Sequence, residues 1–370
     1  MGASDWHTRV AHRRRNRLEE SGGRRLLTGD DLAPRMVTAY VALQDRLLVC
    51  EGEDGSTEGW TAVERLAGVE PRCVVASGES GRVFVGTFED GFFRSTDGGE
   101  SFEGLESAFE REAVMALAVS PHDSDVLYAG TEPSRVYRST DGGDAWTHLE
   151  GIADLPSEPE WFFPPRPETH HVRWLEVDPF DPDRLYVGIE LGALVLSDDG
   201  GDTWRERPPG SRRDNHSLAT HPDREGRVYS AAGDGYARSD DGGETWEQVH
   251  DGLEHTYCWS VVPDPGDPDR VLVSSASGAR SAHTARSADS YVYRREGDDP
   301  WERLDGCGLP TGEGIVRAIF ATTGEPGLVY AVTNRGLFRS RDFGDAWSRL
   351  EVGWDDRPEA ATPRALAVVE

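Results

Sequence analysis

The stretch Ser139-Thr-Asp-Gly-Gly-Asp-Ala-Trp146 decides the fold, because versions of it recur along the chain at regular intervals. The shared pattern is Ser-x-Asp-x-Gly-x-x-Trp/Phe, and two degenerate copies keep only the final tryptophan, at Trp60 and Trp301. The complete copies are Ser95–Phe102, Ser139–Trp146, Ser197–Trp204, Ser239–Trp246 and Ser340–Trp347. Self-similarity at a fixed period is the sequence signature of a repeat architecture.

Each box has the same surroundings, which the second copy illustrates. An apolar strand is predicted over Val114–Val119, followed by a turn with Pro and Asp. Further strands are predicted over Leu127–Thr131 and Val136–Ser139, and a short fourth strand over Trp146–Leu149. Four short strands per unit with a glycine-rich turn are typical of a β-propeller blade.

The box aspartates are predicted to be structural. A carboxylate at this position can accept hydrogen bonds from backbone N–H groups of its own turn, and the glycines permit positive φ. Calcium binding is the alternative, but one acidic turn supplies few of the oxygen ligands that calcium needs. The residues concerned are Asp97, Asp141, Asp199, Asp241 and Asp342.

These boxes resemble the Asp-box, or BNR, repeats of sialidases, xyloglucan-degrading glucanases, sortilin-type receptors and the photosystem II stability factor. The resemblance covers roughly residues 36–370 and implies a propeller fold. It selects no single activity, because this superfamily includes hydrolases, receptors and assembly factors.

Counting strands predicts the number of blades and how the ring closes. Fourth strands lie near Trp60, Phe102, Trp146, Trp204, Trp246, Trp301 and Trp347. First strands begin near Arg72, Val114, Val172, His216, Tyr257, Val316 and Arg364. We therefore predict an all-β protein, a seven-bladed propeller of four-stranded antiparallel blades. Its C-terminal strand, Ala365–Val369, is expected to be the inner strand of the blade that begins at Thr38, which removes open sheet edges.

The composition indicates an acidic protein adapted to salt. Asp and Glu number 68, all 39 basic residues are Arg, and the net charge of the 370 residues is -29. Screening lengths shrink to about 3 Å near 1 M salt, so we expect a halophilic protein from a high-salt cytosol, such as that of a haloarchaeon, and stabilisation by KCl. The charge disfavours nucleic-acid binding. No apolar run suits a membrane span or a secretory signal, and we expect a cytoplasmic monomer.

Residues 1–35 lie outside the predicted propeller domain, 36–370. They contain eight Arg and five acidic residues, a net charge of +3 in an acidic chain. We expect a disordered basic tail. Two alternatives stay open: Arg13, Arg14 and Arg15 contact nucleic acid, or translation begins at Met36 and the tail does not exist.

Three insertions are expected on the propeller face that holds the connections between blades. They are Gly151–Thr169, Ser277–Ser290 and Glu351–Pro363. Loops on a rigid scaffold commonly carry function, so this face is the candidate site.

Aligning the inner strands places one residue of each blade at the channel mouth on this face. The ring, in order, is Arg364, Arg72, Met115, Arg173, His216, Trp259 and Arg317, with Tyr257 close by. Arginine presents a planar set of donors that suits carboxylate, phosphate or sulfate. The alternative is internal charge balance with Glu70, Glu112, Glu176 or Glu313.

Histidines also gather at the starts of three adjacent inner strands, at His170, His171, His216 and His255. Imidazoles at one mouth suit zinc or a similar metal, with help from Asp214 and Glu176. The other interpretation is that they are ordinary exposed polar residues. We expect no metal and no other cofactor.

The resemblance offers an enzymatic alternative. Sialidases hold a substrate carboxylate with three arginines and use a tyrosine nucleophile. Their counterparts here would be Arg317, Arg364, Arg72 and Tyr257. However, sialidases have six blades and an F/Y-R-I-P element that this chain lacks, and the xyloglucan-degrading enzymes pair two propellers.

Spacing along the chain identifies no nucleophile–base pair and no carboxylate pair. The photosystem II stability factor is, by contrast, a seven-bladed Asp-box protein with an arginine-rich surface. We therefore predict a non-catalytic scaffold that binds an anionic small molecule, a glycan or a protein segment at the insertion-bearing mouth. The alternative is a glycoside hydrolase that acts at the same mouth.

Overall fold

The computed structural model describes residues 35–105, 109, 113–353 and 362–370. The chain divides into two units, Met1–Pro34 and Arg35–Glu370, and the description below concerns the second unit. The predicted basic tail therefore lies outside the described residues, apart from Arg35. None of the helices in these ranges is long and apolar enough to cross a membrane.

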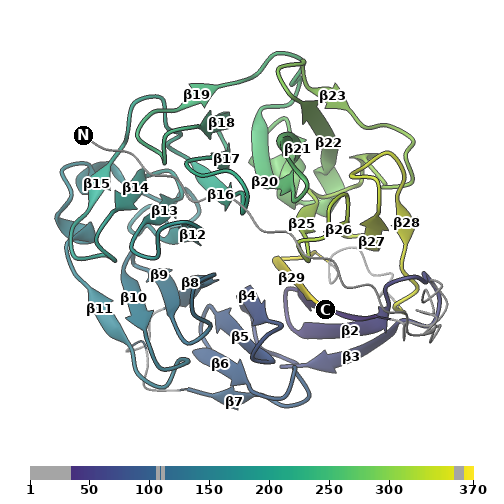
Figure 1. Ribbon diagram of the computed structural model, residues 1–370, viewed down its shortest axis with the longest axis horizontal. Helices are drawn as coiled ribbons and strands as arrows, with labels where there is room; N and C mark the ends of the chain where they lie inside the picture. The colour runs from purple at the N-terminus through teal and green to yellow at the C-terminus, as the bar shows by residue number, and fades with distance from the viewer. Residues whose placement is uncertain (1–34, 106–108, 110–112, 354–361) are drawn as a thin grey trace, which may run out of the picture. The chain divides into compact units, whose positions relative to one another are not determined.

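Seven antiparallel sheets are arranged in a ring, each sheet forming one blade (Figure 1). From the innermost strand outward, blade 1 consists of β29 (Ala365–Val369), β1 (Met36–Ala42), β2 (Leu47–Glu53) and β3 (Thr61–Arg65). Blade 2 consists of β4 (Pro71–Ser77), β5 (Arg82–Thr87), β6 (Phe92–Ser95) and β7 (Glu103–Gly104). Blade 3 consists of β8 (Ala113–Val119), β9 (Leu127–Glu132), β10 (Val136–Ser139) and β11 (Thr147–Leu149).

The remaining blades follow in chain order. Blade 4 consists of β12 (Val172–Val177), β13 (Leu185–Ile189), β14 (Leu194–Ser197) and β15 (Arg205–Glu206). Blade 5 consists of β16 (Asn215–Thr220), β17 (Val228–Ala232), β18 (Gly235–Ser239) and β19 (Glu247–Gln248). Blade 6 consists of β20 (Tyr257–Asp264), β21 (Asp267–Ala276), β22 (Asp289–Glu296) and β23 (Glu302–Arg303). Blade 7 consists of β25 (Ile319–Ala321), β26 (Val329–Thr333), β27 (Gly336–Ser340) and β28 (Ser348–Arg349). The seven-bladed prediction is confirmed.

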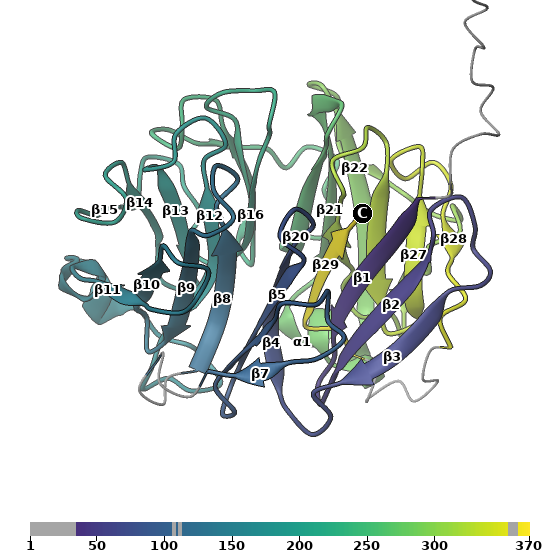
Figure 2. The ribbon, with the colours of Figure 1, turned by 60° about the horizontal axis from the view of Figure 1, so that its bottom comes forward.

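The ring closes as predicted, with the C-terminal strand inside blade 1. β29 pairs antiparallel with β1, from Ala42 opposite Ala365 to Thr38 opposite Val369. Two distant parts of the chain thus share one sheet, and the inner edge of β1 is covered. Figure 2 shows β29 beside β1, with its beginning at the same end of the propeller as the short helix α1 (Ala279–His283).

Blade 6 and blade 7 depart from the simple pattern. Blade 6 gains a fifth strand, because β24 (Gly312–Glu313) pairs with the beginning of β22. β25 begins at Ile319, three residues after the predicted start at Val316. The reason is that the Arg317 N–H donates to the carbonyl of Ala282, in the insertion that carries α1, rather than to the neighbouring strand β26. Because this backbone group bonds to the insertion, the paired part of the inner strand of blade 7 begins only at Ile319.

The core lies between blades, and this explains the composition of the strands. Both faces of a blade pack against neighbours, so inner and second strands are nearly continuous apolar runs, such as the buried Ala-Val-Met-Ala-Leu-Ala of β8. The outermost strands, such as β23 and β28, are exposed and polar. Burial is most complete in second and third strands such as β13 and β14, whereas the inner strands β4 and β29 are partly exposed and the outermost strands are exposed.

Each Asp-box forms a turn that is stabilised by hydrogen bonds between its own residues. In the second copy, Ser139 Oγ donates to Asp141 Oδ1 at 2.8 Å, and the same carboxylate oxygen accepts the backbone N–H of Ala145 at 2.9 Å. Gly143 N donates to Ser139 Oγ at 2.9 Å, and its φ of 90° needs glycine. Equivalent hydrogen bonds occur at Asp97, Asp199, Asp241 and Asp342. The five carboxylates are therefore occupied within their own turns.

Candidate functional site

A β-bulge recurs near the start of five inner strands. In each, one residue of the inner strand is skipped in the pairing with the second strand; in blade 2, for example, Pro71 pairs with Thr87 and Cys73 with Gly86. The skipped residues are Arg72, Met115, Arg173, His216 and Trp259. A bulge leaves one residue unpaired and interrupts the alternation of side chains. These residues are five of the seven that sequence alignment placed in the ring.

The other two members of the ring precede the paired part of their strands. Arg364 lies directly before β29, and its backbone N–H donates to the carbonyl of Ala42 at 2.8 Å. Arg317 lies two residues before β25. All seven residues therefore lie at, or just before, the start of an inner strand.

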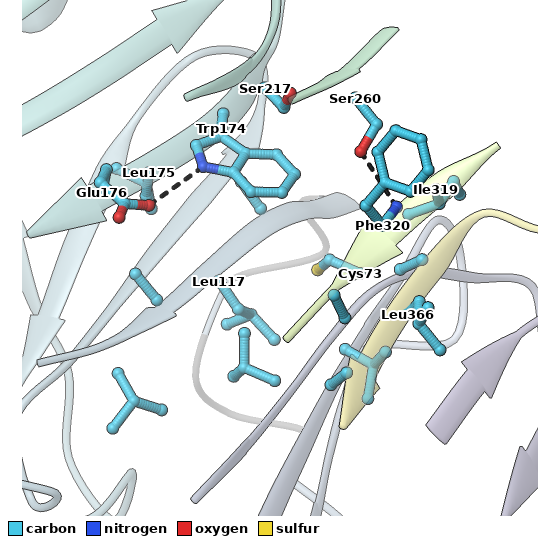
Figure 3. A pocket seen from close by; sticks show the side chains of 18 of the residues that line it. Cys73, Leu117, Trp174, Leu175, Glu176, Ser217, Ser260, Ile319, Phe320 and Leu366 are labelled. Atoms are coloured by element: carbon cyan, nitrogen blue, oxygen red, sulfur yellow. Dashed lines mark hydrogen bonds between the residues drawn. The ribbon is translucent and has the colours of Figure 1, made fainter. Parts of the chain in front are cut away.

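A cavity of about 530 Å³ occupies the channel. Six ring residues line it: Arg72, Met115, Arg173, His216, Trp259 and Arg364. Arg317, which the sequence placed with them at the mouth, is buried and is not part of this lining. Further along the same strands the lining becomes apolar, and Figure 3 shows Leu117, Ile319 and Leu366 around the open space. The channel thus has a cationic and aromatic end followed by an apolar stretch.

Two of the arginines are balanced by carboxylates. Arg72 Nη2 lies 2.5 Å from Glu70 Oε1, which is the pairing that the charge-balance alternative anticipated. Arg173 Nε lies 3.7 Å from Glu190 Oε2, a partner that the sequence did not suggest. The Arg173 guanidinium also lies over the ring of Trp259, 4.6 Å from its centroid, and so spans blades 4 and 6.

Arg317 and Arg364 are different. Arg317 is 1% exposed and donates from Nη2 to the carbonyl of Pro363 at 2.9 Å. Its guanidinium also lies over the Trp259 ring, 4.8 Å from the centroid. Within residues 35–105, 109, 113–353 and 362–370, neither Arg317 nor Arg364 has an ion pair with a carboxylate. In the same ranges, Nε and Nη1 of Arg317 and Nε of Arg364 have no hydrogen-bond partner.

The electrostatics of this pair follow from burial and crowding. Burial and the neighbouring Arg364 lower the pKa of Arg317 to about 9. Burial and the neighbouring Arg72 lower the pKa of Arg364 to about 10. Both guanidinium groups still carry their charge at neutral pH, at a cost in free energy that an anion between them would offset.

The other carboxylates named as balancing partners do not reach these arginines. Glu176 accepts hydrogen bonds from Thr220 Oγ1 at 2.9 Å and from Trp174 Nε1 at 3.3 Å, the second of which is drawn in Figure 3. Glu313 lies in β24, where it pairs opposite Asp289. Glu112 lies outside the described residues. In the described part of the chain, ion pairs with carboxylates therefore balance Arg72 and Arg173, whereas Arg364 and Arg317 have only longer-range attraction to Glu70 and Glu190.

Tyr257 is not part of the cavity lining, and its ring packs against those of His216 and His283. Its hydroxyl is 3.1 Å from Nε2 of His283 in α1, and the His283 ring makes an edge contact with Trp259. Burial and the nearby Glu190 and Asp214 raise the pKa of Tyr257 above its ordinary value. The phenol is therefore held neutral, which is the opposite of what a tyrosine nucleophile requires.

The histidines separate into different environments. His171 Nε2 lies 3.0 Å from Glu190 Oε2, and His216 Nε2 lies 4.0 Å from Glu190 Oε1, so one glutamate joins these two blades. His170 is 3.1 Å from Glu158. His255 contacts the Tyr293 hydroxyl at 2.6 Å within its own blade, apart from the contacts around Glu190.

The sequence reasoning missed Glu190, Glu132 and Arg166. Glu132 and Glu190 each lie two residues after the second-strand glycine of their repeat, and Phe88 holds the equivalent position in blade 2. Arg166, in the first insertion, pairs with Glu132 at 2.7 and 2.6 Å and lies over the ring of Phe88 beside Arg72. An alignment of the second strands at their C-terminal ends, in addition to the alignment of the inner strands, would have identified the positions of Glu132 and Glu190.

Glu176 offers a pH test of the channel interior. Burial, reinforced by the nearby Asp178, raises its pKa to about 7, above the ordinary value of about 4.3. The folded state therefore favours the protonated acid, so this contribution to stability is present below about pH 4.5 and is lost as the pH rises through about 7. We expect the melting temperature of the wild type to fall between pH 5 and pH 8, in thermal melts, relative to that of Glu176→Gln. Glu79→Gln, at an exposed position, should follow the wild type; parallel curves for all three proteins would contradict the prediction.

The fold and repeats together define this chain as a seven-bladed β-propeller that carries BNR/Asp-box repeats. The BNR/Asp-box repeat family matches residues 237–248, which cover the last three residues of β18, the box turn and β19. No curated protein matches the chain by sequence.

Solved structures share the fold at low sequence identity. YCF48 bound to D1 peptide is 14% identical over 89% of each chain, with a TM-score of 0.57. An ancestral GH74 enzyme is 16% identical, with a TM-score of 0.61, over 78% of this chain and 40% of that one. A GH74 enzyme from Niastella koreensis is 16% identical, with a TM-score of 0.60, over 89% of this chain and 55% of that one. This chain thus spans less than two thirds of these two GH74 enzymes. Propellers of this fold therefore include both enzymes and a peptide-binding protein.

Proposed function

We propose that this protein is a non-catalytic binding module that holds an anionic group of its ligand at the arginine-lined end of the channel. The observation that carries the proposal is the pair Arg317 and Arg364, whose guanidinium groups lack carboxylate partners in the described part of the chain. Cations taken from water without a partner are costly, so proteins place them where a ligand supplies the opposite charge.

The ring geometry suits one anion held by several donors. A charge-assisted hydrogen bond contributes about 1.5–3 kcal/mol, and a planar carboxylate or a sulfate can accept from more than one guanidinium. Trp259 fixes Arg173 and Arg317 by stacking, at 4.6 and 4.8 Å, so less rotamer freedom is lost on binding. The site is pre-organised for an anion.

The lining of the rest of the cavity indicates the polarity of the part of the ligand that it would hold. Beyond the ring the lining consists largely of aliphatic side chains, including Val74, Leu117, Leu175 and Leu366, within a volume of about 530 Å³. Such a pocket favours a molecule with a carboxylate at one end and an apolar body. An anionic small molecule, a glycan bearing an acid, or a protein segment ending in a carboxylate would each present that head group. The peptide-bound YCF48 structure supports the protein segment among these.

The same geometry argues against hydrolysis of glycosides. Tyr257, the candidate nucleophile of a sialidase-like reaction, has a raised pKa. Glu190 already accepts from His171, and Glu176 from Thr220 and Trp174. Turnover of aryl glycosides by the purified protein would overturn the proposal in favour of the enzymatic alternative.

The proposal is tested by calorimetric titration with acetate, hexanoate and hexanol, at the lowest KCl concentration that keeps the protein folded. We expect hexanoate to bind with one site per chain. Because each buried methylene contributes about 0.8 kcal/mol, hexanoate should bind at least about tenfold more tightly than acetate. Hexanol, which lacks the charge, should bind more weakly than hexanoate. Equal binding of hexanol and hexanoate, or no saturable binding of either acid, would rule the proposal out.

A further inference from the structure

A second cluster lies beside the arginine ring, where blades 4 and 5 meet. Glu190 follows β13, Asp214 precedes β16 and His216 lies within β16. One ligand atom from each of these three side chains lies within 4.8 Å of the other two. His216 Nε2 is 3.7 Å from Asp214 Oδ1 and 4.0 Å from Glu190 Oε1.

The orientation of His216 is the second and independent observation. Its side chain is 1% exposed, and Nδ1 lies 2.6 Å from the carbonyl oxygen of Cys258. A carbonyl only accepts, so Nδ1 carries a proton and, in the neutral ring, Nε2 carries the lone pair. Among the described residues Nε2 has no hydrogen-bond partner, and it faces two carboxylates at distances too long for hydrogen bonds. A lone pair held in this way, with the other nitrogen fixed by a backbone carbonyl, is the arrangement of a metal ligand.

We propose that Glu190, Asp214 and His216 bind one divalent transition-metal ion, of the class of Zn²⁺. Bonds of about 2.1 Å to a tetrahedral ion place ligand atoms about 3.4 Å apart. The distances of 3.7 and 4.0 Å from His216 Nε2 to the two carboxylates are close to this spacing, and the two carboxylates, within 4.8 Å of each other, would have to move together by up to about 1.4 Å. One imidazole nitrogen and two carboxylate oxygens favour zinc, manganese or iron over magnesium and calcium, which prefer oxygen alone.

The surroundings of the cluster support it. Asp214 Oδ1 accepts the backbone N–H of Leu191 at 2.9 Å, and Glu190 Oε2 lies 3.0 Å from His171 Nε2. These contacts orient both carboxylates, as neighbours of metal ligands commonly do. The ion would bring two positive charges to two carboxylates, of which Glu190 has the Arg173 guanidinium 3.7 Å away. This inference does not depend on anion binding in the channel.

The test is a competition titration of Zn²⁺ between the whole chain and a chromophoric chelator, near neutral pH. Molar KCl screens the exposed carboxylates of this acidic protein, which would otherwise attract cations non-specifically. We expect one Zn²⁺ per chain, no displacement by equal Mg²⁺ or Ca²⁺, and a Zn²⁺-dependent rise in melting temperature. Failure to find a saturable site with one Zn²⁺ per chain would overturn the proposal.

Substitutions inside and outside the proposed ligand set test whether these three residues bind the ion. Asp214→Asn keeps an acceptor for Leu191, and Glu190→Gln keeps one for His171, so both should fold as the wild type does in the presence of EDTA. We expect each to weaken Zn²⁺ binding at least tenfold. The matched controls are His255→Gln and Glu79→Gln, a histidine and an exposed carboxylate outside the ligand set, and both should bind as the wild type does. Equal losses in controls and cluster variants, or unchanged binding in both cluster variants, would also overturn it.

Discussion

Deletion of residues 364–370 is expected to abolish the cooperative folding of the propeller. β29 is the inner strand of blade 1, and its removal exposes the edge of β1 over five paired positions. It also takes Leu366 and Val368, each 9% exposed, out of a core cluster that includes Trp259 and Tyr330. Burying such side chains contributes about 1.5–3 kcal/mol each. Together with the lost backbone hydrogen bonds, the loss approaches the 5–15 kcal/mol that stabilises a typical domain.

The measurement is thermal and denaturant unfolding, followed by circular dichroism in molar KCl. Deletion of residues 1–34 is the control, because the closure of the ring uses none of them. It should leave the melting temperature within a few degrees of that of the intact chain. If both deletions had the same effect, or if the chain without residues 364–370 unfolded at the native midpoint, the role given to β29 would be wrong.

Arg364→Met is expected to weaken hexanoate binding at least about tenfold without lowering the melting temperature of the free protein. A lost charge-assisted contact of about 1.5–3 kcal/mol corresponds to roughly ten- to hundredfold in affinity. The backbone N–H of Arg364, which donates to Ala42, is kept by the substitution. Removal of the charge relieves its repulsion with Arg72 and Arg317. The free protein should therefore be as stable as the wild type or more stable.

Arg303→Met is the matched control, since Arg303 lies on the outer strand β23 and pairs with Glu254 and Asp305. It should bind hexanoate as the wild type does. Calorimetry and thermal melts of the three proteins separate the two interpretations of the ring. If Arg364 serves only internal charge balance, the substitution lowers the melting temperature and the wild type binds no anion.

The sequence by itself determined the architecture of the propeller. The box is a local motif, because Asp141 bonds to Ser139 and Ala145 within its own turn, and its recurrence counts the blades. The position of Ala365–Val369 after the last box determined how the ring closes. The position of the ring residues at the starts of the inner strands could also be predicted, because the apolar strands and their turns align the repeats whatever the length of the insertions between them.

Only the tertiary structure decided what the ring residues contact. The bulges at Arg72, Arg173 and His216 arise from pairing with a second strand whose register the sequence does not show. Glu190 joins His171, Arg173 and His216 across two blades, while Arg317 stacks on Trp259 of the neighbouring blade. Strands and turns are determined by residues close together in the chain, so the repeating pattern of the sequence is enough to predict them. Pairing of charges depends on side-chain directions and on distances between blades, and these exist only after the ring has closed.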